Sequence, residues 1–173
     1  GSMAEENTGN PGKGASCSLG HGGFRTEHFS CCAVMENGKY RIETPGYADY
    51  FSGENENPDD TPVPVPVDYL NGAVASCMAI SYEAAAKKLG IGLRGLRTEV
   101  KSDLDMKKVY GIVPGGPALN GFHVRFIVDA PDADEYLLRK AAVKAERSSV
   151  VGKTLGVSIT YSWERDSAGD KER

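Results

Sequence analysis

The sequence predicts an α+β domain with a largely antiparallel sheet and two main helices. Several segments alternate apolar and polar residues, as strands with one packed face do. Two longer segments have helical periodicity. Their order is a β-hairpin, a helix, two strands, a helix and a strand, so strands and helices do not alternate strictly. This order argues against a doubly wound nucleotide-binding fold. A chain of 173 residues is long enough for one domain with a full core.

The two ends of the chain have the composition of disordered segments. Residues 1–21 are rich in Gly, Ser, Asn and Glu, and they open with Gly1-Ser2, which resembles the remnant of a cleaved tag. Cys17 in this arm is either an ordinary surface cysteine or a reactive thiol. Residues 165–173 are a charged tail. The folded domain is therefore expected to span residues 22–164.

The domain is expected to begin with a β-hairpin. Residues 24–35 have strand character, Asn37-Gly38 favours a two-residue turn, and residues 40–44 alternate apolar and charged side chains. Cys31 and Cys32 are adjacent, so in a strand they face opposite sides of the sheet.

Residues 67–89 form the strongest predicted helix, after a proline-containing acidic segment at 45–66. Pro66 suits the first turn, because proline needs no hydrogen-bond donor there. One stripe at helical spacing is predicted to face the core, and three further residues widen it. The stripe is Leu70, Val74, Cys77 and Ser81, widened by Ala73, Ile80 and Ala84. By itself this pattern favours Cys77 as a small buried hydrophobe.

The second half of the chain is expected to form two strands, a helix and a last strand. Residues 93–105 and 122–128 alternate, with His123 on the exposed side of its strand and a loop at 106–121 between them. Asp132 is the predicted cap of a helix ending near Arg147, and residues 156–163 form the last strand. The two apolar helices need more cover than one small sheet offers, which indicates a homodimer with the first helix at its interface.

Composition excludes several classes of function. The formal charge of −4 gives no basic footprint for nucleic acid. No apolar run is long enough to span a membrane, and no signal peptide opens the chain. The cysteines form neither a regular disulfide framework nor a zinc motif, so we expect a reducing cytoplasmic location, no metal and no cofactor. Gly152-Lys153-Thr154 is not a P-loop, because Arg147 stands where the first glycine is required.

Four segments resemble the OsmC/Ohr family, the thiol-dependent hydroperoxide reductases and osmotically inducible proteins. PVDYLNGAVASCMAI resembles the family pattern NPEELLxxALxxCxxx, and AERSSVVGKTLG is similar to AxxxCPVxxTL. YGIVPGG and GFHVRFIVDAPDADEYLLRKAA resemble the loop, strand and second helix of the family. The resemblance covers residues 22–164. It implies an intertwined homodimer with two active sites at the interface.

The resemblance also implies roles for particular residues. Cys77 corresponds to the peroxidatic cysteine. In the family, an arginine of the N-terminal hairpin, held by a glutamate, activates that thiol. Gly22-Gly23-Phe24-Arg25 resembles the GGR of the family, which makes Arg25 the candidate and Arg41 the alternative. Activation is needed because a thiolate, not a thiol, attacks a peroxide.

The chain departs from the family at two positions. The glutamate aligns with Val67, one residue before Asp68, and the resolving cysteine aligns with Ser149. We therefore expect one of two functions. The first is an organic hydroperoxide reductase in which a thiol reductant, or one of the other three cysteines (Cys17, Cys31 and Cys32), resolves oxidised Cys77. The second is a non-catalytic domain that binds a small apolar ligand in the groove of the dimer.

Overall fold

The computed structural model describes residues 26–36, 39–43, 58–59 and 64–167, and they form one five-stranded sheet covered by helices. The strand order is β2-β1-β3-β4-β5, antiparallel except for the parallel pair β4–β5. The strands are β1 (Thr26–Glu36), β2 (Lys39–Glu43), β3 (Gly95–Asp105), β4 (Leu119–Asp129) and β5 (Ile159–Arg165). The predicted α+β class with a largely antiparallel sheet is confirmed.

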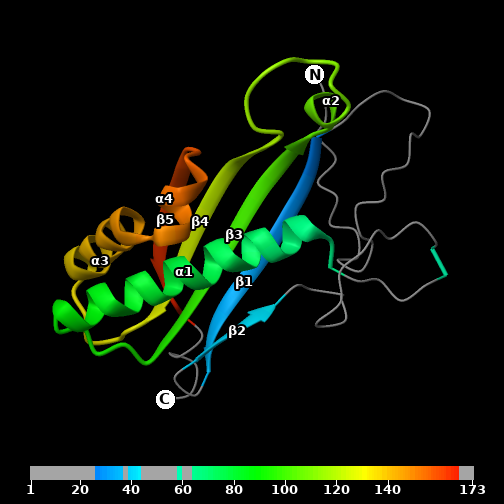
Figure 1. Cartoon of the computed structure of the whole chain (residues 1–173). Coiled ribbons are helices and arrows are strands. Elements are labelled where there is room, and N and C mark those ends of the chain that lie inside the picture. The colour runs from blue at the N-terminus through cyan, green and yellow to red at the C-terminus, as the bar shows by residue number, and fades with distance from the viewer. Residues whose placement is uncertain (1–25, 37–38, 44–57, 60–63, 168–173) are drawn as a thin grey trace, which may run out of the picture.

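Helices α1 (Pro66–Lys88), α3 (Glu135–Ser148) and α4 (Val150–Leu155) lie on one face of this sheet, whereas α2 (Met106–Val109) follows β3 at one end of it (Figure 1). Helix α1 crosses β1 and β3, while α3 and α4 lie beside it toward β5. Tyr82 of α1 joins the layers: its ring lies 4.9 Å from that of Phe126, and its hydroxyl donates to the Leu138 carbonyl at 3.0 Å. The core therefore lies between one sheet and one layer of helices.

The predicted alternation of the strands is confirmed. The helix-facing residues of β3 and β4 are buried, namely Leu96, Thr98, Val100, Ser102, Phe122, Val124, Phe126 and Val128. The opposite face of the sheet is polar. There Arg97 pairs with Glu43 and Glu99, and Arg125 pairs with Glu99 and Glu164. Such cross-strand pairs allow an antiparallel sheet to leave one face in water.

The predicted inward face of the first helix is only partly right. Val74 is buried and Leu70 packs against the core, but the three widening residues Ala73, Ile80 and Ala84 are exposed, and Ile80 is 57% accessible. The apolar residues of α1 that meet the sheet and α3 are instead Val74, Ala75, Met78, Ala79, Tyr82, Ala85 and Ala86. Helix α1 is apolar around most of its circumference, so its periodicity did not identify the side that packs.

Element boundaries differ from the prediction in four places. The cap of α3 is Asp134 and not Asp132, because the Asp134 carboxylate accepts the Tyr136 N–H at 2.7 Å. The turn expected after this helix contains α4, and the expected loop at 106–121 contains α2 and the start of β4. Strand β5 extends to Arg165, whose guanidinium donates to the carbonyls of Ala130 and Ala133 at 2.6 and 2.7 Å.

Candidate active site around Cys77

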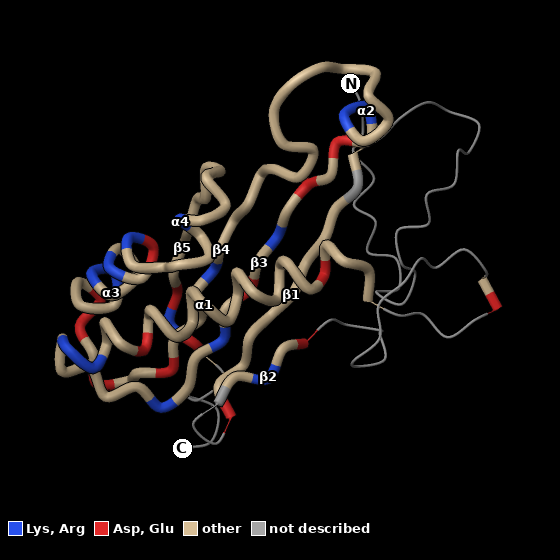
Figure 2. Tube along the Cα trace, in the orientation of Figure 1, with Lys and Arg blue, Asp and Glu red and all other residues tan. Residues whose placement is uncertain are grey.

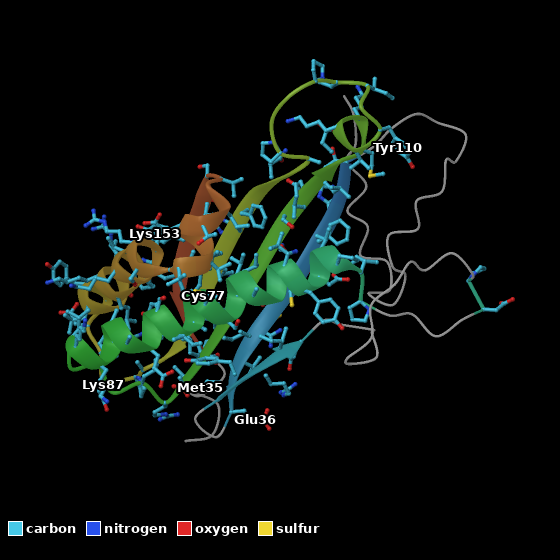
Figure 3. The ribbon with its side chains drawn as sticks, viewed as in Figure 1. Met35, Glu36, Cys77, Lys87, Tyr110 and Lys153 are labelled. Carbon is cyan, nitrogen blue, oxygen red and sulfur yellow. The ribbon has the colours of Figure 1, made fainter. Side chains whose placement is uncertain are left out.

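Cys77 is a half-buried free thiol in the middle of α1, and its sulfur accepts two hydrogen bonds (Figure 3). The Ser149 hydroxyl donates to Cys77 Sγ at 3.3 Å, and the Val151 backbone N–H donates to the same atom at 3.5 Å. Both donors belong to the start of α4. The site therefore forms where α4 packs against α1.

Ser149 is fixed by a second interaction. It is fully buried and caps α4, with its Oγ accepting the Gly152 N–H at 3.1 Å. Gly152 lets this turn approach α1 closely: a Cβ there would lie 3.0 Å from Met78 Cε and 3.2 Å from Ser149 Oγ. A short helix with a glycine at its contact point thus holds the serine hydroxyl against the thiol.

The accessible surface near Cys77 is uncharged and largely apolar, with Ser76 and Ser81 as partly exposed polar neighbours on α1. Ala73 and Ile80 lie one helical turn before and after Cys77, and Val150 of α4, 72% accessible, follows Ser149 directly. Helix α1 has no charged residue between Asp68 and Glu83, and Figure 2 shows this uncharged stretch. The thiol therefore opens onto apolar side chains and not onto a charged patch.

The structure does not bring Arg41 to Cys77, and Arg25 lies outside the described residues. Arg41 is on β2, where it pairs with Glu36 at 2.7 Å and with Glu43 at 2.5 Å. The hydrogen bonds to Glu36 and Glu43 raise the pKa of the Arg41 guanidinium. Within the described part of the chain, no charged side chain hydrogen-bonds to Cys77.

Asp68 caps the helix that contains it. Its buried carboxylate accepts the Val65 N–H at 2.8 Å and so closes the first turn of α1. Burial raises the pKa of Asp68, and the hydrogen bond from Val65 opposes that rise. Val67, at the position of the family glutamate, is a half-buried apolar residue of the same turn.

Cys31 and Cys32 lie on opposite faces of β1, as predicted. Cys31 Sγ donates to the Glu43 carbonyl at 3.3 Å and would touch a Cβ at Gly72. Gly72 and Cys77 are separated by about 140° around a helix of 3.6 residues per turn. Cys32 lies on the polar face, where Arg97 donates to its sulfur at 3.0 Å. Neither thiol is placed to bond Cys77 without rearrangement, and Cys17 is outside the described residues.

Sequence reasoning missed the contributions of Val151 and Gly152. The Val151 donor is a backbone group, for which no side-chain pattern exists. Ser149 followed by a glycine three residues later agrees with a helix cap, but the sequence indicated only a break there. His123 was expected on the exposed side of its strand; it lies on the polar face, but it is half-buried there and contacts the hydroxyls of Thr160 at 2.7 Å and Ser162 at 3.0 Å.

A surface groove of about 340 Å³ lies away from this thiol, on the outward side of α3. It is lined by Tyr136, Arg139, Lys140, Val143, Lys144 and Arg147. Its lining comes from one helix and includes no cysteine or carboxylate.

The described residues contain no cluster of three or more His, Cys, Asp or Glu that could hold a metal ion. Among the described helices, none is both long and apolar enough to cross a membrane.

Comparison with known proteins identifies the family. A family model described as OsmC-like protein matches residues 58–164, which is more than half of the chain. The structure resembles that of an OsmC-like protein from Mycoplasma pneumoniae, with a TM-score of 0.55, 13% identity, and 81% of this chain and 97% of that chain covered. An OsmC-like hydroperoxide resistance protein from Jannaschia sp. CCS1 matches with a TM-score of 0.46, 15% identity, and 77% and 88% covered. No curated protein sequence matches the chain. The chain belongs to the OsmC-like protein family.

Proposed function

We propose that this protein is a thiol-dependent reductase of organic hydroperoxides, with Cys77 as the attacking residue. One observation carries the proposal: Cys77 is a half-buried thiol on an apolar surface, with hydrogen-bond donors on its sulfur. Donors to the sulfur favour the thiolate, which is the form that attacks peroxides. The apolar side chains around it suit the organic part of a hydroperoxide.

The reaction balances with Cys77 as the group that is oxidised. The thiolate attacks the distal oxygen of ROOH, so an S–O bond forms, the O–O bond breaks, and the leaving alkoxide takes a proton to become ROH. Cys77 is then a sulfenic acid. An external thiol condenses with it, forming a mixed disulfide and water. A second thiol displaces Cys77, which regenerates the thiol and releases the oxidised reductant.

An external reductant is part of the proposal because of Ser149. This residue contacts Cys77 Sγ at 3.3 Å, in the position that the resemblance assigns to the resolving cysteine, and serine cannot form a disulfide. Cys31 meets α1 at Gly72, and Cys32 lies on the opposite face of the sheet. A cycle with one protein cysteine and a small thiol donor therefore fits the geometry best.

We also propose that a second copy of the chain covers the outward side of α1. Ala73, Ile80 and Ala84 leave an apolar surface there, next to exposed Val150. A helix that is apolar on both sides needs a second packing partner. In such a homodimer Cys77 would lie in a groove near the interface, and Arg25 would be the cation implied by the family resemblance.

The test is the reaction of the reduced protein with cumene hydroperoxide, followed by intact mass and peptide mapping. We expect rapid gain of one oxygen at Cys77, and steady consumption of peroxide with dithiothreitol as the donor. Cys77→Ser should abolish both, whereas Cys32→Ser should retain them, since Cys32 lies on the other face of the sheet. If Cys77 remains a thiol under excess peroxide while circular dichroism shows an intact fold, the reductase proposal fails.

A second candidate function is binding of a small apolar ligand without turnover. It is favoured by the replacement of two family residues, with Val67 and Ser149 in place of glutamate and cysteine, and by the use of Asp68 in capping α1. In that case Cys77 would be inert. An apolar fluorescent probe such as anilinonaphthalene sulfonate should then bind, and Ile80→Asp should weaken its binding.

A further inference from the structure

We infer that the Ser149 hydroxyl is a hydrogen-bond donor that stabilises the Cys77 thiolate. Ser149 would then have a role of its own and would not only mark the loss of a second cysteine. Its part in turnover rests on the proposed reductase function, but the hydrogen bond itself can be measured without peroxide. The geometric basis is the 3.3 Å contact between Ser149 Oγ and Cys77 Sγ, at a serine that is fully buried.

The Ser149 side chain is held so that its proton can reach the sulfur. A serine hydroxyl has one donor and two acceptor positions. The Gly152 N–H occupies one acceptor position at 3.1 Å, which fixes Oγ at the start of α4. The hydroxyl proton points at Cys77 Sγ, and a hydrogen bond to a charged acceptor is stronger than one to a neutral thiol.

The surroundings of Cys77 make this donor important. Its partners among the described residues, Ser149 and Val151, are uncharged. The charged residues near the start of α4 are Lys153, Glu146 and Arg147, and within the described chain none of them hydrogen-bonds to Cys77. Among the described residues of the sheet, the titratable side chains that face α1 are Cys31 of β1, beside Gly72, and Tyr40 of β2, whose hydroxyl donates to the Glu83 carboxylate at 2.7 Å. Stabilisation of a thiolate in the described part of the site therefore comes from neutral donors.

The serine also differs chemically from the cysteine that it replaces. A thiol is a weak hydrogen-bond donor, whereas a hydroxyl donates strongly to an anion. With serine at position 149, the site lacks a thiol that could resolve Cys77 but has a stronger hydrogen-bond donor beside its sulfur. This fits a cycle in which Cys77 is activated within the protein and reduced from outside it.

The experiment measures alkylation of Cys77 by iodoacetamide from pH 6 to pH 10 on the full chain, with the site identified by peptide mapping. The variants are Ser149→Ala and Ser149→Gly. Glycine is a useful partner to alanine because it costs only a few tenths of a kcal/mol as a helix cap. Asp134→Ala is the matched control, since it removes the cap of α3 and leaves Cys77 and its two donors unchanged.

We expect the midpoint of the pH–rate profile to move upward by about one pH unit in both Ser149 variants, so that alkylation at pH 7 slows about tenfold. The Asp134 variant should keep the wild-type midpoint. An unchanged midpoint in folded Ser149→Ala and Ser149→Gly would overturn the inference. A shifted midpoint in a protein that does not consume cumene hydroperoxide would support the hydrogen bond while rejecting the reductase function, so the two failures are distinguishable.

Discussion

The Ser149 hydroxyl lies 3.3 Å from the Cys77 sulfur, although the two residues are 72 positions apart in the chain. The contact joins the start of α4 to the middle of α1. It puts beside Cys77 the serine that the sequence resemblance aligns with the resolving cysteine of the family. It also gives a direct way to test the correspondence of the two positions.

Ser149→Cys should restore an internal disulfide. Two sulfurs at these positions need a bond of about 2.05 Å, which small rotations of the side chains can reach from a 3.3 Å contact. Oxidation with one equivalent of cumene hydroperoxide should form a disulfide between Cys77 and position 149, seen by mass spectrometry as a loss of two hydrogens. Closing this loop should stabilise the oxidised form by on the order of 4 kcal/mol.

Ser148→Cys is the control for that variant. Ser148 is exposed, and its hydroxyl donates to the Lys144 carbonyl at 2.8 Å and not to Cys77. A disulfide in the Ser148 variant with none in the Ser149 variant would contradict the placement of α4 against α1.

Gly152→Ala should destabilise the protein by about 1–2 kcal/mol, because the added methyl group crowds Met78 and Ser149. It should also slow alkylation of Cys77 by displacing the serine hydroxyl. Gly92→Ala is the matched control, since a Cβ at Gly92 meets nothing within 4 Å. Urea unfolding of both variants measures the difference. Equal stabilities would contradict the close approach of α4 to α1.

Cys32 should react far more slowly than Cys77 with iodoacetamide. Burial raises the pKa of the Cys32 thiol from its ordinary value of 9.0 to about 11, although Arg97 partly opposes the rise. At pH 8 about one Cys32 in a thousand is then a thiolate. Peptide mapping after brief labelling should therefore find Cys77 modified and Cys32 unmodified. Preferential labelling of Cys32 would show that its side of the sheet is more open than the structure indicates.

The same shift in the pKa of Cys32 predicts how stability depends on pH. The folded pKa is higher than the unfolded value, so the contribution of the neutral thiol is complete below pH 9 and is lost as the pH rises through about 11. Cys32→Ala should therefore lose less stability than the wild type between pH 9 and pH 11. Urea unfolding at both pH values measures this. A steeper loss of stability in the variant than in the wild type would contradict this prediction.

Ile80→Asp should convert the proposed homodimer to a monomer. Ile80 is 57% accessible in the single chain, and a buried carboxylate at an apolar interface is strongly unfavourable. Tyr136→Asp is the control, because Tyr136 is also exposed but lies on the outward side of α3. Sedimentation velocity should show a smaller species for the Ile80 variant alone. A monomeric wild type would reject the homodimer.

Much of the fold could be predicted because its local patterns are strong. Alternation in β3 and β4 identified the residues that face the helices, and the order of the elements excluded a doubly wound sheet. The parallel pairing of β5 with β4 could not be read from the sequence, because alternation does not specify a neighbouring strand or its direction. The caps were less predictable, since Asp132 and Asp134 are both suitable and the fold uses the second.

The candidate site was only partly predictable. Short segments that resemble the family identified Cys77 as the candidate thiol and aligned Ser149 with the resolving cysteine. The positions of Asp68 and Arg41 in space could not be predicted from these segments, because a helix cap fixes Asp68 and ion pairs with Glu36 and Glu43 fix Arg41. Asp68 shows this: it lies one residue from the position of the family glutamate, but its carboxylate caps α1.

The sequence by itself determined the order of the five strands and two main helices, the apolar character of α1 and the thiol at its centre. Tertiary structure decided which side of α1 meets the sheet and which group meets the thiol. The physical reason is that a helix apolar around most of its circumference has no preferred face until partners pack against it. Met78 and Tyr82 are buried because the sheet and α3 pack against that side of α1. Cys77 lies on another side of the helix, where Ser149 of α4 hydrogen-bonds to its sulfur.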